Sequence, residues 1–352
     1  MKKFTALICT AVLTIGLLAG CSGGTSKVPS TTDGKDVYIL VPSADHGWTG
    51  AALESAKQKA EEISAEDVYH VTVQAATDAK SQQEQLDDLL SRAKTPAGIV
   101  VLPYDNTLES SLLRLTKSGI PFVMYDRIVA NPVVQEAVVA NVKGDHIGIG
   151  SNTAERFLKN GLQPGEKVYV MVGDTSSVPE LRTGGFKDTL IAAGWTADDL
   201  KNLEFSPVTN WSRSLSKQLF TDWINGKTTE ELEQIHYIFV HDDEIAMGVL
   251  EALAGTEIEQ AKKEVFCRSI QAFGASSGLE ELYQVLRGTH SNAAYPKIIK
   301  NFDLFSLTYY PSTVQLAMQD MIDFLDGKAV ANDHTIPLEM VDASNVSEYT
   351  GF

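Results

Sequence analysis

The chain has 352 residues, of which 29 are Lys or Arg and 46 are Asp or Glu, so its formal net charge at pH 7 is −17. With 43% hydrophobic residues it is too apolar for a disordered chain and too long for one small core, which predicts two domains of similar size. The acidic balance leaves no excess of cations to neutralise phosphates and therefore excludes a nucleic-acid binder.

The first twenty residues are typical of an export signal. Lys2 and Lys3 precede an apolar stretch, 4–18, that is too short for a bilayer span. The sequence Leu-Ala-Gly-Cys at 18–21 resembles the lipobox of bacterial lipoproteins. That resemblance implies a lipoprotein signal peptide at 1–20 and an acylated Cys21 that anchors the protein outside the cytoplasm. The alternative is an ordinary signal peptide with an incidental cysteine.

Removal of the signal also removes Cys9, leaving Cys21 and Cys267, so no disulfide is expected. Cys267 lies in an apolar run and is predicted to be a buried, inert thiol. Residues 21–35 are small and polar without periodicity, which indicates a flexible tether.

From residue 36 onward, short β-branched runs alternate with helical patterns. The first series predicts strands at 37–41, 71–75, 98–102 and 122–125, and helices at 50–63, 81–93 and 108–117. The second series predicts strands near 138 and at 167–172, 203–205, 237–240 and 265–273, and helices at 148–159, 184–193, 214–224, 244–253 and 279–286. This alternation predicts an α/β fold of two doubly wound lobes, each with a parallel sheet.

Ligands of open parallel sheets bind beyond the carboxyl ends of the strands, so the residues there are the candidates for a site. They are Ser43 to Trp48, Tyr104, Asp105, Asp126, Arg127, Asn141, Gly173, Asp174, Arg182, Asn210, Trp211, His241 to Asp243, and Gly274 to Ser276. Carboxylates, guanidinium groups and indoles together suit a neutral polyol, because its hydroxyls donate and accept while an aromatic face covers its C–H side.

Four segments carry a family resemblance. They are the run from Gly119 to the Asp126-Arg127 pair, Arg182 with Gly185-Phe186, Asn210-Trp211-Ser212-Arg213, and His241 to Gly248. In this order they resemble the sugar-binding subfamily of type I periplasmic binding proteins, from about residue 36 to the C-terminus.

The resemblance implies two doubly wound lobes joined by a three-segment hinge. The N-terminal lobe is expected at 36–128 plus 312–336, and the C-terminal lobe at 129–311 plus 337–352. It further implies a monomer that binds a monosaccharide or related polyol and delivers it to the permease of an ABC importer, without cofactor, metal or catalysis. A receptor that presents a sugar-like signal to a sensor kinase or chemoreceptor is the alternative.

The resemblance also assigns roles. Asp126 and Arg127 bind sugar hydroxyls, Arg182 reaches ring or anomeric oxygens, and Trp48 and Trp211 cover the ring from opposite lobes. Asp242 replaces a ligand-binding Asn, which keeps the acceptor and loses the donor. Asp45 and His46 fall where relatives have Asn or Asp. Asn141 stands where the family commonly has Asp, and Tyr309 occupies the position of a family Gln. Gly274-Ala275-Ser276 stands where relatives have a sugar-binding Asp.

One enzymatic pattern is also present. Gly274 to Gly278 satisfies G-x-S-x-G between a strand and a helix, with Asp303 and His334 downstream, which is the order of a serine hydrolase triad. Few residues follow Gly278 to build a hydrolase and no oxyanion loop precedes it, so an esterase using Ser276 is a remote alternative.

Overall fold

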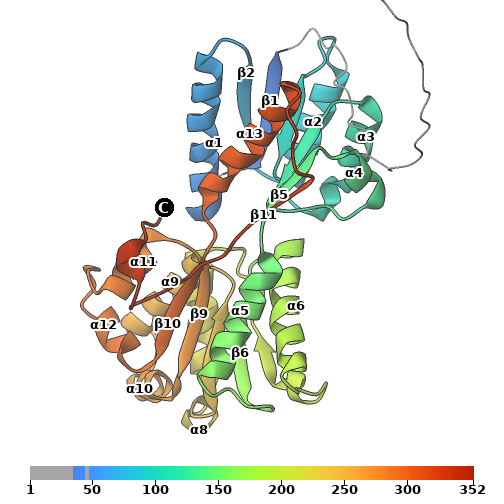
Figure 1. Cartoon of the computed structure of the whole chain (residues 1–352). Helices are drawn as coiled ribbons and strands as arrows, with labels where there is room; N and C mark the ends of the chain where they lie inside the picture. Colours follow the sequence, from blue (N-terminus) through green and yellow to red (C-terminus); the bar gives the residue numbers. More distant parts are fainter. Residues whose placement is uncertain (1–34, 44–46) are drawn as a thin grey trace, which may run out of the picture.

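The computed structural model describes residues 35–43 and 47–352 (Figure 1). The predicted signal peptide, Cys21, nearly all of the predicted tether, and the candidates Asp45 and His46 lie outside the described residues. Within the part of the chain that the structure describes, no helix combines the length and apolar character that a bilayer span needs.

The first lobe is built on a parallel sheet of six strands in the order β11-β5-β4-β3-β1-β2. Its strands are β1 (Asp36–Pro42), β2 (His70–Ala76), β3 (Gly98–Val101), β4 (Phe122–Tyr125), β5 (Ala140–Gly144) and β11 (Asp333–Ile336). Its helices are α1 (Gly47–Ala65), α2 (Ala79–Ser91), η1 (Asn106–Leu108), α3 (Glu109–Ser118), α4 (Pro132–Ala137), η4 (Pro311–Thr313) and α13 (Val314–Leu325).

Both faces of this sheet are covered, which explains its near-continuous apolar strands. Val37 and Ile39 of β1 pack in the same core cluster as the small residues Ala52 and Ala56 of α1, whereas Leu40 packs with the leucines of α2 and α3. Successive side chains of a strand point to opposite faces, so β1 contributes side chains to the cores on both sides of the sheet.

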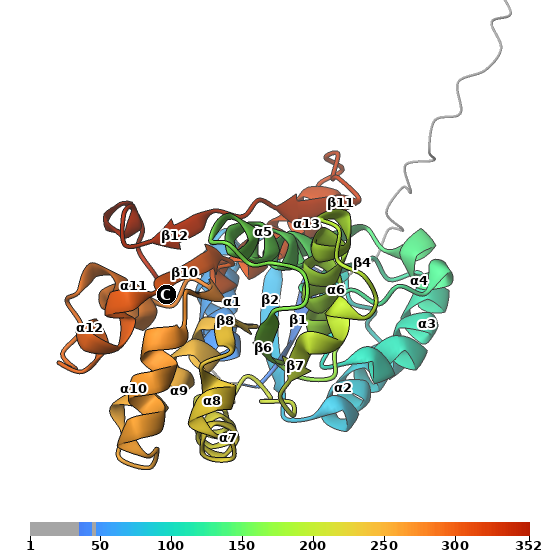
Figure 2. The same cartoon turned by 90° about the horizontal axis from the view of Figure 1, so that it is seen from below.

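The second lobe is built on six strands in the order β12-β10-β9-β8-β6-β7, of which only β12 is antiparallel to its neighbour. Its strands are β6 (Lys167–Met171), β7 (Leu203–Phe205), β8 (Ile235–Val240), β9 (Ala272–Ser277), β10 (Asp303–Thr308) and β12 (Met340–Asp342). Its α-helices are α5 (His146–Lys159), α6 (Ser177–Ala192), α7 (Arg213–Asn225), α8 (Thr229–Leu232), α9 (Asp243–Ala254), α10 (Gln260–Ser269), α11 (Glu280–Arg287) and α12 (Tyr295–Ile298), and its 3₁₀ turns are η2 (Asp199–Asn202), η3 (Ile299–Asn301) and η5 (Val346–Glu348). Figure 2 shows α5 and α6 on one face of this sheet and α7, α9 and α10 on the other.

The chain passes between the lobes three times. The first passage follows β5, the second follows β10, and the third joins β11 to β12, so the segment 312–336 returns to the first sheet and the tail completes the second (Figure 1). The two doubly wound parallel lobes predicted from the sequence are therefore confirmed.

Two details of the sequence prediction are wrong. The strand expected near Val138 is the end of α4, and β5 begins only at Ala140; because β5 pairs with β4, the first sheet extends beyond the predicted boundary at residue 128. The strand expected at 265–273 is the helix α10 followed by β9. In α10 only Phe266 is fully buried, and Cys267 on the next position is half-buried, with burial raising the pKa of its thiol to about 11.

Candidate ligand-binding site

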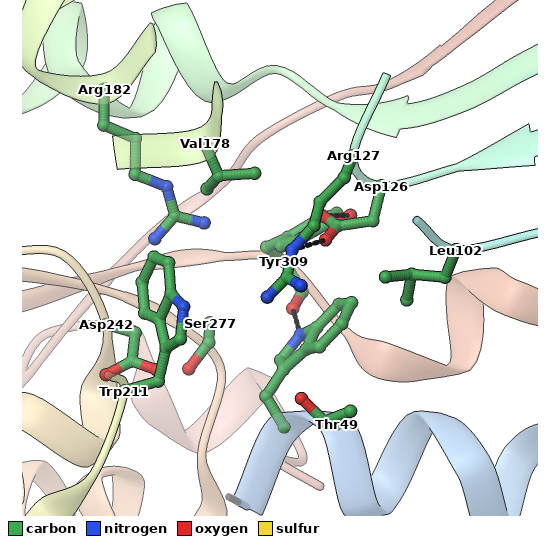
Figure 3. A pocket seen from close by; sticks show the side chains of 11 residues that line it. Thr49, Leu102, Asp126, Arg127, Val178, Arg182, Trp211, Asp242, Ser277 and Tyr309 are labelled. Carbon is green, nitrogen blue, oxygen red and sulfur yellow. Dashed lines mark hydrogen bonds and ion pairs between the residues drawn. The ribbon is translucent and has the colours of Figure 1, made fainter. Parts of the chain in front are cut away.

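A cavity lies between the lobes, beyond the carboxyl ends of strands from both sheets. The empty space between its walls, including its open mouth, measures about 400 Å³. The lining residues come from both lobes and the second hinge passage and are Trp48, Thr49, Leu102, Asp126, Arg127, Val178, Arg182, Trp211, Asp242, Ser277 and Tyr309 (Figure 3).

Asp126 is held at the centre of a hydrogen-bonded group. The phenol of Tyr309 donates to its Oδ1 at 2.5 Å, and Nε2 of His146 lies 3.2 Å from the same oxygen. Burial acts to raise the pKa of Asp126, but the hydrogen bond and charge of His146 and the charge of Arg127 hold that pKa below its usual value. The carboxylate is therefore ionised, and no described residue donates to Oδ2, which is left to accept from a ligand.

Arg127 uses most of its donors within the protein. One terminal nitrogen donates to the carbonyl oxygens of Tyr104 and Pro103, and the other donates to Oδ2 of Asp174 at 3.1 Å. Nε is buried, lies 4.0 Å from Oδ2 of Asp126 and makes no hydrogen bond to a described residue. Two guanidinium N–H groups thus remain for a ligand, that of Nε and the second one of Nη2.

Arg182 enters the cavity from α6 of the second lobe. Its Nη1 donates to the carbonyl of His241 and to Oγ of Ser276 at 3.0 Å, and its guanidinium carbon lies 5.5 Å from the ring centre of Trp211. Burial lowers the pKa of Arg182, while the charges of Asp242 and Asp126 oppose that shift. Its buried Nε makes no hydrogen bond to a described residue, so it is a second donor for a ligand.

Glycines set the position of α6. A Cβ at Gly150 of α5 would overlap the carbonyl of Arg182, and a Cβ at Gly185 of α6 would overlap the carbonyl of Ile147. Only glycine permits such a close approach of two helix backbones. Gly185, which matches the family pattern, therefore allows α6 to pack closely against α5. This packing directs Arg182 toward the cavity.

The two indoles are held by different means. Trp48, at the start of α1, donates from Nε1 to the carbonyl of Tyr309 at 2.8 Å and stacks on its ring at 5.1 Å. Trp211 has a φ of 59° after Asn210 at 50°, both in the left-handed region that large side chains rarely adopt. A Cβ at Gly173 would overlap the indole of Trp211, so this glycine provides the space for the ring.

Consecutive buried carboxyl groups begin α9. Asp242 caps the helix by accepting from the backbone N–H of Ile245 at 2.9 Å, and burial raises its pKa well above the usual value. Burial also raises the pKa of Asp243 to about 6, although the N–H groups of Gly278 and Leu279 donate to it. Asp242 lines the cavity, whereas Asp243 fixes the start of the loop that follows Ser277, the last residue of β9.

A sequence model described as "Periplasmic binding protein domain" matches residues 37–297. The chain belongs to the periplasmic binding protein family. Its relatives include the fructose import binding protein FruE of Bifidobacterium longum, 22% identical over 99% of this chain and 96% of that protein, and the ribose import binding protein RbsB of Bacillus subtilis, 24% identical over 72% and 77%. A solved galactofuranose binding protein superposes with a TM-score of 0.68 at 17% identity, over 89% of this chain and 96% of that structure, which shows the same fold.

This periplasmic binding protein brings together seven of the ten predicted ligand residues, namely Trp48, Asp126, Arg127, Arg182, Trp211, Asp242 and Tyr309. Asn141 is not among the lining residues, because it lies in β5 and its amide donates to Oε1 of Gln135 at 2.8 Å. The expectation for Asn141 is therefore corrected.

The lining residues that the sequence analysis missed are Thr49, Leu102, Val178 and Ser277. Leu102 directly follows β3 and Ser277 ends β9, while Thr49 and Val178 lie in the first turn of the helices α1 and α6 that follow β1 and β6. Their side chains, however, carry no charge or large ring that would single them out. His146 was missed as well, since its role is to contact Asp126 from behind the cavity wall.

The three residues of the hydrolase pattern do not form a triad. Ser276 is fully buried and bonds to Arg182 and to the carbonyl of His241. Asp303 bonds to Arg156, while His334 lies in the first lobe beside Asp320. The G-x-S-x-G match therefore occurs without the triad of a serine hydrolase. Within the described ranges, no cluster of His, Cys, Asp or Glu side chains is arranged to hold a metal ion.

Proposed function

We propose that this protein captures a monosaccharide or a related polyol between its lobes outside the cytoplasm and delivers it to an ABC importer. The observation that carries the proposal is the cavity between the lobes, where ionised Asp126 and the free Nε donors of Arg127 and Arg182 meet two indoles. This combination of acceptors, planar donors and aromatic faces matches the alternating hydroxyl and C–H surfaces of a sugar.

Asp242 completes the polar set. Its carboxyl oxygens keep the acceptor of the family's Asn, and burial, which raises the pKa of the group well above its usual value, favours the protonated form that also donates. Trp48 and Trp211, one from each lobe, cover the two sides of the sugar ring.

The mechanism is binding coupled to closure. A sugar that is held by one lobe gains contacts to the other only when the lobes close, and this differential affinity shifts the population toward the closed form. The permease would recognise that form. Import binding proteins for fructose and ribose among the relatives support this assignment.

A thermal-shift screen of the purified protein against pentoses, hexoses, polyols and short oligosaccharides tests the proposal. A sugar present at about 100 times its dissociation constant stabilises the fold by about 2.7 kcal/mol, which gives a clear rise in melting temperature. Titration calorimetry of each hit, on wild type and Arg182→Ala, then checks that the stabilising sugar binds in the cavity. A failure of every sugar to stabilise the protein would reject the proposal.

We also propose that the protein is a monomer anchored to the cell membrane through lipid on Cys21. The Leu-Ala-Gly-Cys sequence at 18–21 supports this anchoring. In cells labelled with a fatty acid, wild type should carry the label and remain with the membrane fraction, whereas Cys21→Ala should not be labelled. Equal labelling of the two proteins would contradict the anchor.

A further inference from the structure

An ion pair joins the two lobes beside the cavity. Arg127 follows β4 of the first sheet, and Asp174 follows β6 of the second. Nη2 of Arg127 lies 3.1 Å from Oδ2 of Asp174, and the two side chains are only 10% and 19% exposed. Because its members belong to different lobes, this pair exists only when the lobes are closed.

Each partner is fixed within its own lobe before the pair forms. The other terminal nitrogen of Arg127 donates to the carbonyls of Pro103 and Tyr104 in the first lobe. Oδ1 of Asp174 accepts from the backbone N–H of Ser176 at 2.9 Å and from its hydroxyl at 2.6 Å in the second lobe. Little side-chain freedom is then lost on pairing, which removes the main cost of a surface ion pair.

Asp174 is not part of the cavity wall. It lines a neighbouring groove whose empty space, including its open mouth, measures about 790 Å³, together with Tyr104, Asp105 and Asn210, whereas Arg127 borders both the groove and the cavity. A sugar in the cavity therefore contacts Arg127 without contacting Asp174. Any effect of Asp174 on sugar binding has to pass through Arg127 or through the closed state itself.

We infer that the Arg127–Asp174 pair is a latch that stabilises the closed lobes and sets how tightly and how long the ligand is held. The pair raises the fraction of the protein in the closed, binding-competent form, and the apparent dissociation constant falls in proportion to that fraction. It also fixes the guanidinium so that Nε stays toward the cavity. The effect on affinity rests on the proposed sugar-binding function, but the effect on lobe closure does not.

Asp174→Asn is the variant that isolates the latch. Asparagine retains the oxygen that accepts from Ser176, so the start of α6 stays intact, while the charge that pairs with Arg127 is lost. Asp87→Asn is the matched control, because it removes an ion pair to Arg114 within the first lobe alone. Melting temperatures of all three proteins establish that they are folded.

The first measurement is the distance between the lobes without ligand. Spin labels on cysteines that replace the exposed residues Lys80 and Lys201, in a background where Cys9, Cys21 and Cys267 are all replaced by Ser, report it by pulsed electron resonance. Asp174→Asn should shift the distances toward longer values, whereas Asp87→Asn should leave them as in wild type.

The second measurement is the affinity and dissociation rate of a sugar identified by the thermal-shift screen. Asp174→Asn should bind about tenfold more weakly, equivalent to about 1.4 kcal/mol, with most of the change in the dissociation rate. A longer distance without binding of any sugar would support the latch and reject the sugar function. If Asp174→Asn left the distance between the lobes unchanged, and either left the sugar affinity unchanged or no sugar bound at all, the latch would be overturned. If a sugar did bind with unchanged affinity, the sugar function would still stand.

Discussion

On the first-lobe wall of the cavity, side chains are held by hydrogen bonds to the hinge, whereas on the second-lobe wall an indole is held by packing. Asp126 and Trp48 both bond to Tyr309, which lies on the passage between the lobes. Trp211 instead fits against Gly173 beneath the guanidinium of Arg182. A change on the first wall should therefore disturb both the ligand contact and closure, while a change on the second should act locally.

Asp126→Ala is expected to have the largest effect. It removes the acceptor of Tyr309 and the contact with His146 in addition to the ligand contact, and hydrogen bonds to a charged group are worth about 1.5–3 kcal/mol each. Sugar affinity should fall by about 3 kcal/mol or more, as measured by calorimetry. Asp333→Ala on the outer strand β11, which removes an ion pair to Lys143 of β5, is the control and should bind normally. A small loss for Asp126→Ala would contradict the central role of this carboxylate.

Trp211→Ala should weaken binding by about 1–3 kcal/mol through lost apolar burial. Gly173→Ala should act in the same direction, because its methyl group would displace the indole without contacting the ligand. Gly184→Ala is the matched control, since no atom lies within 4 Å of its added Cβ. If Gly173→Ala bound the sugar like wild type, the packing explanation for the second wall would be wrong.

The carboxyl group of Asp243 should leave a pH signature on stability rather than on binding. Its pKa is raised by burial to about 6 in the folded protein from 3.8, so the folded state holds the proton more tightly and stability declines as pH rises through that interval. Between pH 4.5 and 7 this one group contributes a decline of about 2 kcal/mol. Urea unfolding should show a smaller decline for Asp243→Asn than for wild type. The same pH dependence in both proteins would rule out this contribution.

Tyr309→Phe should have the smallest effect. It removes only the hydroxyl that donates to Asp126 and retains the ring on which Trp48 stacks. A loss in affinity of about 1.5 kcal/mol, the lower end of the range for a hydrogen bond to a charged group, is expected. A loss as large as that of Asp126→Ala would show that the phenol itself contacts the ligand.

The sequence predicted the second wall of the cavity nearly as well as the first, because Asp126, Arg182 and Trp211 are charged or aromatic residues in the segments that follow strands. It failed for β5. Its place in the first sheet depends on pairing with β4 and with β11, for example Asn141 with Asp333, and no local pattern carries such distant information. The role of Gly173 could not be predicted either. A glycine gives no local signal in the sequence, and its role follows only from the position of the Trp211 indole in the fold.

The three passages between the lobes have a consequence for how the chain reaches its native state. The first sheet lacks β11 and the helix α13 until residue 336 has been synthesised, and the second lacks β12 until residue 342. A polypeptide ending anywhere between 145 and 310 would carry an unfinished sheet in each half, with the edge of β5 unpaired. Neither lobe can complete its sheet on the ribosome before the other lobe is almost fully synthesised, so the folding of both lobes requires nearly the whole chain.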